Sequence, residues 1–377
     1  MRRRSGKGKA APPVRRAETR VGERSVRAAT PTRRIELTFL PGLKQTVEAE
    51  VREHLPTLRD VKVVPGRDDA VWIEYPDAWG RLLGLRTVVA PFAVLTFPVP
   101  RPRSLTSPDH LGTIARTVGI VGKLNQATPP TSFRIDAAGH DSPTFQRIAE
   151  LVATETGLEY DETDGDVVLR FRPSAVIKEG WDVLVRLSTR PLSQRTWRVR
   201  DLPGAVNATI AAAIVRATKP QPGDRVANLM CGSGTLLIER LQVAPAKFAL
   251  GVDNDPAAVA DCTANLRAAG LRDRVQLVEE DLAGDGWAQY GPFDLLLADP
   301  PWGGLVGDHA TNDELYPLLL DRAADVAAPN ARFAVLTHEI KLLERCLQDT
   351  KSWRQESSLS VYQKGPQPRI FLLRKVN

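Results

Sequence analysis

From residue 207 to the end of the chain, short apolar runs alternate with stretches of helical periodicity, and this alternation constrains the fold more than any other feature. Strands that alternate with helices form parallel, doubly wound sheets, because a parallel crossover needs a connection of helix length. The sequence therefore predicts an α/β domain with a mostly parallel sheet and a closing antiparallel hairpin. The expected strands are 225–229, 248–252, 275–278, 293–298 and 332–337, the expected helices are 207–218, 236–241, 257–268, 313–326 and 339–347, and the hairpin is 357–362 with 369–373.

The stretch Asp299-Pro300-Pro301-Trp302 directly follows one of these strands. Two prolines cannot continue a central strand, since they lack the N–H that the ladder needs. The chain must therefore leave the sheet at Asp299 and present a carboxylate, a proline carbonyl and an indole at the carboxyl edge, where open α/β sheets bind ligands. An acceptor beside a flat ring suits a planar base with an exocyclic amine. The structural alternative is a Pro-Pro turn beside a buried tryptophan.

A glycine-rich turn, Cys231-Gly232-Ser233-Gly234-Thr235, lies between the first strand of this domain and the following helix. Glycines allow a sharp turn and a close approach of the backbone to a ligand, while N–H groups at a helix start face an anionic group. The sequence lacks both the third glycine of a dinucleotide fingerprint and the Gly-Lys-Ser/Thr of a phosphate loop. Both departures argue against NAD and ATP.

Carboxylates follow the next two strands. Asp253 ends the second strand, 21 residues after Gly232, and is placed to accept hydrogen bonds from two vicinal ribose hydroxyls. Asp281 ends the third strand and could accept from an adenine amine. Each carboxylate alone is compatible with a helix cap or a solvated turn. Together they indicate a cofactor with an adenosine and a small charged tail but no phosphate, which points to S-adenosylmethionine.

The residues before this domain predict two smaller α+β units, 35–100 and 101–190, followed by a linker, 191–206. The second unit carries no catalytic constellation, so it is interpreted as a binding or positioning module. A Ser142 N-cap is expected to open a helix at 145–156. The other expected elements are strands 35–39, 61–64, 70–75, 92–97, 132–136, 167–171 and 182–188, with helices at 43–55 and 109–124.

Charge is distributed unevenly along the chain, whose formal net charge is +6. Residues 1–34 hold twelve Lys or Arg against two Glu, which leaves 39 basic and 43 acidic residues in the remainder. With almost no large apolar residues, this tail is expected to be disordered, and it could either contact phosphate backbones or merely aid solubility.

The segment 183–200 contains five arginines and Trp197 but no acidic residue. Guanidinium groups and an aromatic face are what nucleic-acid backbones and unpaired bases engage, although a solvated charge run is the usual alternative. We interpret the cluster as an RNA contact. Its members are Arg186, Arg190, Arg195, Trp197, Arg198 and Arg200.

At this point the residues resemble a known family. The run 228–239, together with Asp299-Pro300-Pro301-Trp302, resembles the THUMP-containing RNA methyltransferases, although Asn228 stands where the family usually has Asp. Residues 40–43 and 191–198 are similar to its upstream domains. The resemblance implies a ferredoxin-like domain at 35–100, a THUMP-like domain at 101–190 and a Rossmann-like methyltransferase domain at 207–377. It also implies methyl transfer to an exocyclic amine, commonly guanine N2.

We therefore expect an S-adenosylmethionine-dependent tRNA (guanine-N2) methyltransferase that acts on the acceptor stem. Asp299 and the Pro300 carbonyl would accept from the amine, and Trp302 would stack on the base. The alternatives are a 23S rRNA guanine-N2 enzyme, an RNA adenine-N6 enzyme and a non-catalytic RNA-binding protein that keeps the fold. The predicted catalytic residues are Asp299, Pro300, Pro301 and Trp302, and the predicted cofactor residues are Asn207, Asn228, Met230, Cys231, Gly232, Ser233, Gly234, Thr235, Asp253, Asn254, Asp281, Leu282 and Asp299.

The remaining features bear on compartment and partners. No apolar run approaches the ~20 residues of a membrane helix, and the N-terminus lacks a secretory h-region. Cys231, Cys262 and Cys346 are too few and too scattered for a disulfide framework or a zinc cluster, which fits a reducing cytoplasm. We expect a cytoplasmic monomer whose partner is RNA and which needs no metal.

Overall fold

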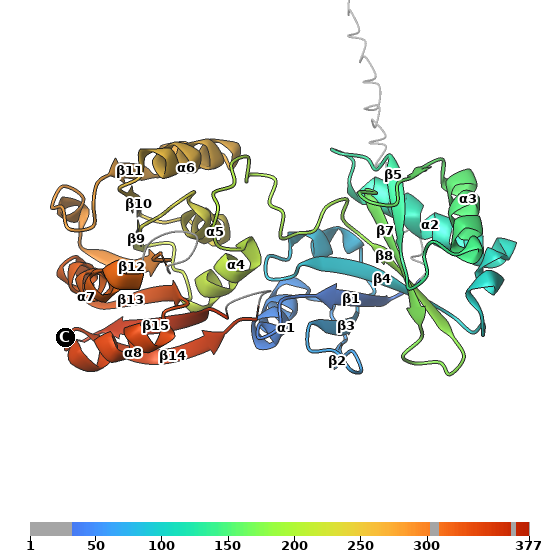
Figure 1. Cartoon of the computed structure of the whole chain (residues 1–377), viewed down its shortest axis with the longest axis horizontal. Coiled ribbons are helices and arrows are strands. Elements are labelled where there is room, and N and C mark those ends of the chain that lie inside the picture. The colour runs from blue at the N-terminus through green and yellow to red at the C-terminus, as the bar shows by residue number, and fades with distance from the viewer. Residues whose placement is uncertain (1–31, 302–308, 363–366, 377) are drawn as a thin grey trace, which may run out of the picture.

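The computed structural model describes residues 32–301, 309–362 and 367–376, which form two modules lying side by side (Figure 1). The predicted disordered tail, 1–34, lies almost entirely outside the described residues, and so does Trp302. Within the described part of the chain, no helix is both long and apolar enough to cross a membrane.

The C-terminal module is built on a seven-stranded sheet in the order β11-β10-β9-β12-β13-β15-β14. The first five strands in this order pair in parallel, whereas β15 pairs antiparallel with both β13 and β14. This confirms the predicted Rossmann-like domain with its closing hairpin. The strands are β9 (Arg225–Leu229), β10 (Phe248–Asp253), β11 (Gln276–Glu279), β12 (Phe293–Ala298), β13 (Ala327–Thr337), β14 (Trp353–Ser360) and β15 (Arg369–Lys375).

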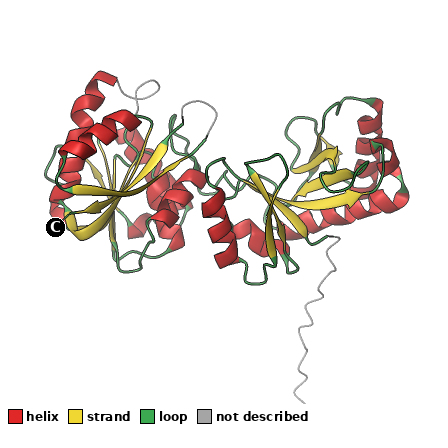
Figure 2. Ribbon diagram, turned by 90° about the horizontal axis from the view of Figure 1, so that it is seen from below, coloured by secondary structure: helices red, strands yellow, loops and turns green. Residues whose placement is uncertain are grey.

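Helices cover both faces of this sheet (Figure 2). Successive strand residues point to opposite faces, so Leu295 packs in one apolar core and Leu296 in the other. Helices α4, α5 and α6 contribute to the first core, and α7 and α8 contribute to the second. The helices are α4 (Ala208–Ala217), α5 (Thr235–Val243), α6 (Pro256–Ala268), α7 (His309–Asp325) and α8 (Ile340–Asp349).

The N-terminal module contains one eight-stranded sheet in the order β2-β3-β1-β4-β8-β7-β5-β6. Strand β4 pairs with β8, so both predicted N-terminal units contribute to a single sheet, and the boundary between them stays a prediction. Helices α1, α2 and α3 pack in the apolar core of one face. The elements are β1 (Arg34–Thr38), α1 (Lys44–His54), β2 (Asp60–Val63), β3 (Ala70–Glu74), β4 (Ala90–Phe97), α2 (Pro108–Leu124), β5 (Ser132–Asp136), α3 (Pro143–Thr156), β6 (Glu159–Tyr160), β7 (Val167–Pro173) and β8 (Trp181–Arg186), with short 3₁₀ helices at Trp79–Gly84 and Pro102–Thr106.

Several details of the elements differ from the sequence prediction, among them the start of β14 at Trp353 rather than at residue 357. Helix α3 begins at Pro143, and the Ser142 side chain makes no capping hydrogen bond, although Ser142 is the N-cap residue. The two-residue strand β6 is too short to produce a periodic pattern. Strand β13 begins at Ala327, which pairs with Phe293 of β12. The register then shifts before Arg332 pairs with Leu295, so the Pro-Asn sequence lies in the irregular part of the strand.

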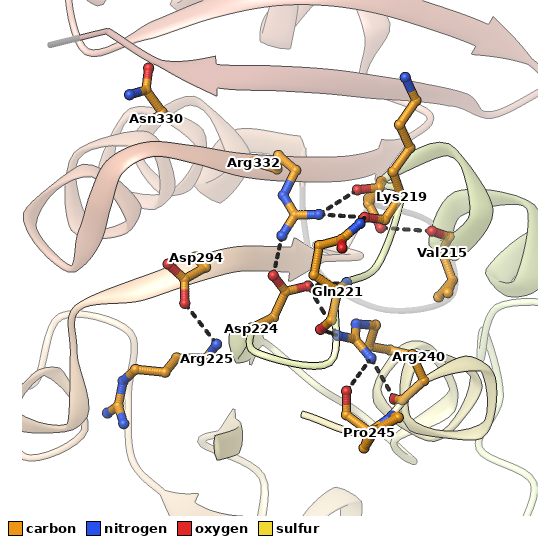
Figure 3. Close-up of polar contacts among 12 residues, drawn as sticks. Val215, Lys219, Gln221, Asp224, Arg225, Arg240, Pro245, Asp294, Asn330 and Arg332 are labelled. Carbon is orange, nitrogen blue, oxygen red and sulfur yellow. Dashed lines mark hydrogen bonds and ion pairs between the residues drawn. The ribbon is translucent and has the colours of Figure 1, made fainter. Parts of the chain in front are cut away.

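A buried ion cluster fastens the amino-terminal edge of the catalytic sheet (Figure 3). Asp224, just before β9, pairs with Arg240 of α5 at 3.0 Å and also with Arg332 of β13. Arg332 donates at 2.7 Å to the carbonyls of Thr218 and Lys219, which follow α4. The cluster therefore ties two helices and two strands together on the edge opposite the strand ends that carry the predicted site.

Candidate active site

A cavity of about 300 Å³ opens at the carboxyl ends of β9, β10, β11 and β12. This is the edge at which parallel α/β sheets bind ligands. The structure brings most of the predicted cofactor and catalytic residues to its lining. These are Asn228, Met230, Cys231, Gly232, Ser233, Thr235, Asp253, Asn254, Asp281, Leu282, Asp299 and Pro301.

The glycine-rich turn after β9 requires glycine for two reasons. Gly232 and Gly234 both have positive φ, at +52° and +84°, which side-chain-bearing residues rarely adopt. A Cβ at Gly234 would also lie only 2.5 Å from the Cys262 sulfur. The Gly232 N–H donates to the Asp253 carboxylate at 2.7 Å, so the end of β10 holds the turn in place. The turn thus forms a fixed floor of the cavity.

Among the described residues, the cavity lining is acidic and contains no Lys, Arg or His. Five carboxylates line it: Asp253, Asp255, Glu280, Asp281 and Asp299. Such a lining favours a ligand that carries positive charge and disfavours one that carries phosphate, because nothing in the lining would neutralise phosphate charge.

Asn228 presents an acceptor to this cavity. Its side-chain nitrogen donates to the Leu297 carbonyl at 3.2 Å, which fixes the amide so that Oδ1 is left without a hydrogen-bond partner among the described residues. The buried Ser233 hydroxyl also has no partner there. Buried polar atoms without partners are costly, so these atoms indicate a ligand with matching groups. The ammonium, hydroxyl and amine donors of S-adenosylmethionine fit this acceptor-rich lining.

Asp299 follows β12 directly and borders the cavity. Its Oδ1 atom is buried and accepts no hydrogen bond within the described chain. Desolvation raises the pKa of this carboxyl to about 7. Near neutral pH, Asp299 can therefore both accept a hydrogen bond and hold a proton, which is suited to an acceptor for an amine that loses a proton.

Four of the predicted site residues do not line the cavity or cannot be placed there. Asn207 caps α4, since its Oδ1 accepts from the Thr209 N–H at 2.9 Å. Gly234 and Pro300 lie within the loops that bound the cavity but are not among its lining residues. Trp302 lies outside the described residues, so its predicted stacking role stays a prediction.

Most side chains of the predicted RNA cluster make contacts within the protein. Arg195 pairs with the fully buried Glu239 at 2.8 Å, and Arg198 donates to the Val206 carbonyl at 2.8 Å. Trp197 is buried, and so is Arg186, whose guanidinium donates to the Ser188, Asp166 and Thr189 carbonyls. The side chains of Arg186, Arg195, Trp197 and Arg198 are therefore packed or hydrogen-bonded within the protein, and direct RNA contact by them stays a prediction. Arg190 and Arg200 are exposed and stay predictions.

Sequence reasoning missed the segment 202–206, which lines the cavity on the side of the interdomain linker. This segment carries no charged residue after Asp201, and its Leu202-Pro203-Gly204 start is typical of an ordinary loop. Leu315 of α7 also lines the cavity and gave no signal, because it lies within an apolar helical pattern.

Comparison with known proteins adds to this geometry. Residues 195–369 match the family described as "UPF0020: RMKL-like, methyltransferase domain". The chain is 28% identical over 358 residues to the tRNA (guanine(6)-N2)-methyltransferase of Thermus thermophilus, with 91% of this chain and 99% of that protein covered. The human tRNA (guanine(6)-N(2))-methyltransferase THUMP3 is 26% identical over 45% of this chain and 36% of its own length. The crystal structure of TrmN from Thermus thermophilus superimposes with a TM-score of 0.67 at 25% identity, covering 91% of this chain and 99% of TrmN.

Proposed function

We propose that this chain, whose residues 195–369 belong to the RMKL-like methyltransferase family, transfers a methyl group from S-adenosylmethionine to the N2 amine of a guanosine in tRNA. The observation that carries the proposal is the position of Asp299. Its buried carboxylate oxygen, which has no hydrogen-bond partner among the described residues, lies where β12 ends at the cavity, with the Pro300 carbonyl next in the chain.

Different lining residues would contact different parts of the cofactor. Asp253 would accept from the ribose hydroxyls, and Asn228 Oδ1 from the methionine ammonium group. Asp281, held at 3.0 Å by the Asn254 amide, would accept from the adenine amine. When bound, S-adenosylmethionine supplies a methyl group on a positively charged sulfur. The acidic lining stabilises that positive charge.

An exocyclic guanine amine is a weak nucleophile, because its lone pair is delocalised into the ring. As the nitrogen bonds to the methyl group, the bond from the methyl group to sulfur would break and the neutral thioether S-adenosylhomocysteine would leave, while the nitrogen pyramidalises and develops positive charge. The Asp299 carboxylate and the Pro300 carbonyl would accept hydrogen bonds from this amine and stabilise that charge. Asp299, with its raised pKa, would then take the released proton. Stacking of the base on Trp302 would add ~1–3 kcal/mol.

The substrate class follows from the whole chain rather than from the cavity. The Thermus relative is matched across nearly its full length, including the N-terminal module, and its name specifies guanine 6 of tRNA. We propose the same nucleotide in the acceptor stem for this chain, with a cytoplasmic location and a monomeric state as parts of the proposal. Ribosomal RNA is the rival substrate.

A methyl-transfer assay separates these possibilities. The purified chain would be incubated with S-adenosylmethionine labelled in its methyl group and with tRNA or rRNA fractions from a strain that lacks the gene. The proposal predicts label in tRNA with the parent chain and none with Asp299→Asn. Equal labelling by Asp299→Asn would contradict the role of this carboxylate, and label confined to rRNA would contradict the substrate class.

A further inference from the structure

The segment 199–206 joins the N-terminal module to the catalytic domain and runs along the cofactor cavity. Its last five residues, 202–206, line that cavity, yet the segment contains no helix or strand. A loop in this position needs side-chain anchors to keep a defined shape, because the regular hydrogen bonding of a helix or strand is missing. The anchors of this segment are Asn265 and Arg198.

Asn265 holds the start of the segment. This α6 residue is fully buried, and its Oδ1 accepts from the N–H groups of Val199 at 3.0 Å and Arg200 at 2.9 Å. Its Nδ2 donates to the Arg200 carbonyl at 3.0 Å and to the Ser233 carbonyl at 3.1 Å. One side-chain amide therefore joins the segment directly to the glycine-rich turn that forms the cavity floor.

Arg198 holds the end of the segment. A single guanidinium nitrogen, Nη2, donates to the Val206 carbonyl and to the Thr235 hydroxyl, both at 2.8 Å. Thr235 is the first residue of α5 and lines the cavity, as does Val206. The guanidinium also lies over the Trp197 ring, 5.6 Å from its centroid, and forms a longer contact of 3.4 Å with Asp201. Arg198 thus links the two ends of the segment and connects them to the start of α5, which also lines the cavity.

We infer that Arg198 and Asn265 are positioning residues for the cofactor site, which fix segment 199–206 as one wall of the cavity. The inference rests on the proposed use of S-adenosylmethionine. Neither side chain lines the cavity, so each acts through the groups it holds. Without these anchors the wall populates other conformations, and the apparent Kd rises by the reciprocal of the fraction that remains competent.

Isothermal titration of the full chain with S-adenosylhomocysteine tests the inference. We expect Arg198→Ala to raise the Kd about tenfold or more, because hydrogen bonds from a charged group are among the stronger ones. Arg198→Lys, which restores one donating nitrogen, should recover part of the affinity. Arg267→Ala is the matched control, since it removes an exposed guanidinium on α6, two residues after Asn265, that does not line the cavity.

The affinity for tRNA, measured over a range of salt concentrations, distinguishes this role from an RNA contact. The inference predicts that Arg198→Ala leaves the tRNA Kd and its salt dependence unchanged. A weaker and less salt-dependent tRNA Kd with unaltered S-adenosylhomocysteine binding would overturn it. If Arg198→Ala lowers the melting temperature into the assay range, Arg198→Met retains the apolar stem against Trp197 and should show the same weaker cofactor binding.

Two remaining outcomes separate this inference from the proposed function. Parental affinity for S-adenosylhomocysteine in both Arg198→Ala and Arg198→Met would overturn the inference alone. A parent chain that binds no S-adenosylhomocysteine would overturn the proposed function, and the inference with it.

Discussion

At the scale of single residues, the structure separates side chains that meet a ligand from those that meet other side chains. The acceptors at the strand ends, such as Asn228 and Asp253, were predictable, because strand order alone brings them to one edge. The intramolecular partners of the arginines were not predictable. Arg195, for example, forms an ion pair with Glu239, which is 44 residues further along the chain. No local sequence pattern predicts that pairing.

The raised pKa of Asp299 makes the rate of methyl transfer depend on pH. The carboxylate form is the acceptor in the proposed chemistry, so activity should fall as the pH drops below about 7. Single-turnover rates with saturating tRNA between about pH 5 and about pH 9 would record this profile. A rate that stays constant across that range would contradict the role of Asp299.

The same carboxyl should destabilise the folded protein at neutral pH. Its folded-state pKa is raised from 3.8 to about 7, so between these values the folded state binds more protons than the unfolded state. Stability is therefore lost as the pH rises through this window. Asp299→Asn should melt at a higher temperature than the parent near pH 8, and thermal melts should show the difference shrinking towards about pH 4. A lower melting temperature for Asp299→Asn at both pH values would contradict this account.

At the scale of elements, apolar periodicity located the strands and helices well, because central strands such as β9 and β12 are buried on both faces and helices such as α2 and α3 on one. It placed β9 and β12 within the bounds that the structure has. It missed the first residues of β13, where the Pro-Asn sequence lies in a register irregularity rather than in a regular strand pattern. It also gave no indication that residues 202–206 of the predicted linker line the cavity, since that part of the chain is held by Arg198 and Asn265 rather than by a periodic pattern of its own.

The buried cluster around Asp224 makes a prediction at this scale. Asp224→Ala removes the carboxylate that Arg240 and Arg332 share and leaves a fully buried guanidinium unpaired. We expect a loss of about 3–5 kcal/mol in the free energy of unfolding, measured by urea denaturation. Asp285→Ala is the control, because its ion pair with Arg322 is exposed on the aspartate side, and such pairs contribute about 0–1 kcal/mol. Similar losses in the two variants would contradict the importance of the cluster.

At the scale of the whole molecule, a buried carboxylate joins the two modules. Glu239 of α5 is fully buried and accepts from Arg86 of the N-terminal module at 2.8 Å, as well as from Arg195. Arg195 also donates to the Arg86 carbonyl at 2.7 Å, so the linker, the N-terminal module and the catalytic domain meet at one point. The N-terminal module is thereby held in a fixed relation to α5, the helix that starts at the cofactor cavity.

The contacts of Glu239 with Arg86 and Arg195 should affect catalysis on tRNA more than they affect cofactor binding. Arg86→Ala removes one ion pair between the modules, leaves the pair of Arg216 with Glu53 in place, and touches no group that lines the cavity. If the N-terminal module positions tRNA over the cavity, kcat/KM for tRNA should fall about tenfold or more, while the Kd for S-adenosylhomocysteine stays unchanged. Arg374→Ala, which removes an exposed ion pair within the catalytic domain, is the control. An unaltered kcat/KM in Arg86→Ala would show that these contacts do not position the substrate.

The most direct test of the central claim is the identity of the nucleoside that the enzyme produces. The tRNA from a strain lacking the gene, treated with the parent chain and S-adenosylmethionine, would be digested to nucleosides and examined by mass spectrometry. The account predicts N2-methylguanosine with the parent chain and its absence with Asp299→Asn. The appearance of N6-methyladenosine, or of N2-methylguanosine with both chains, would contradict it.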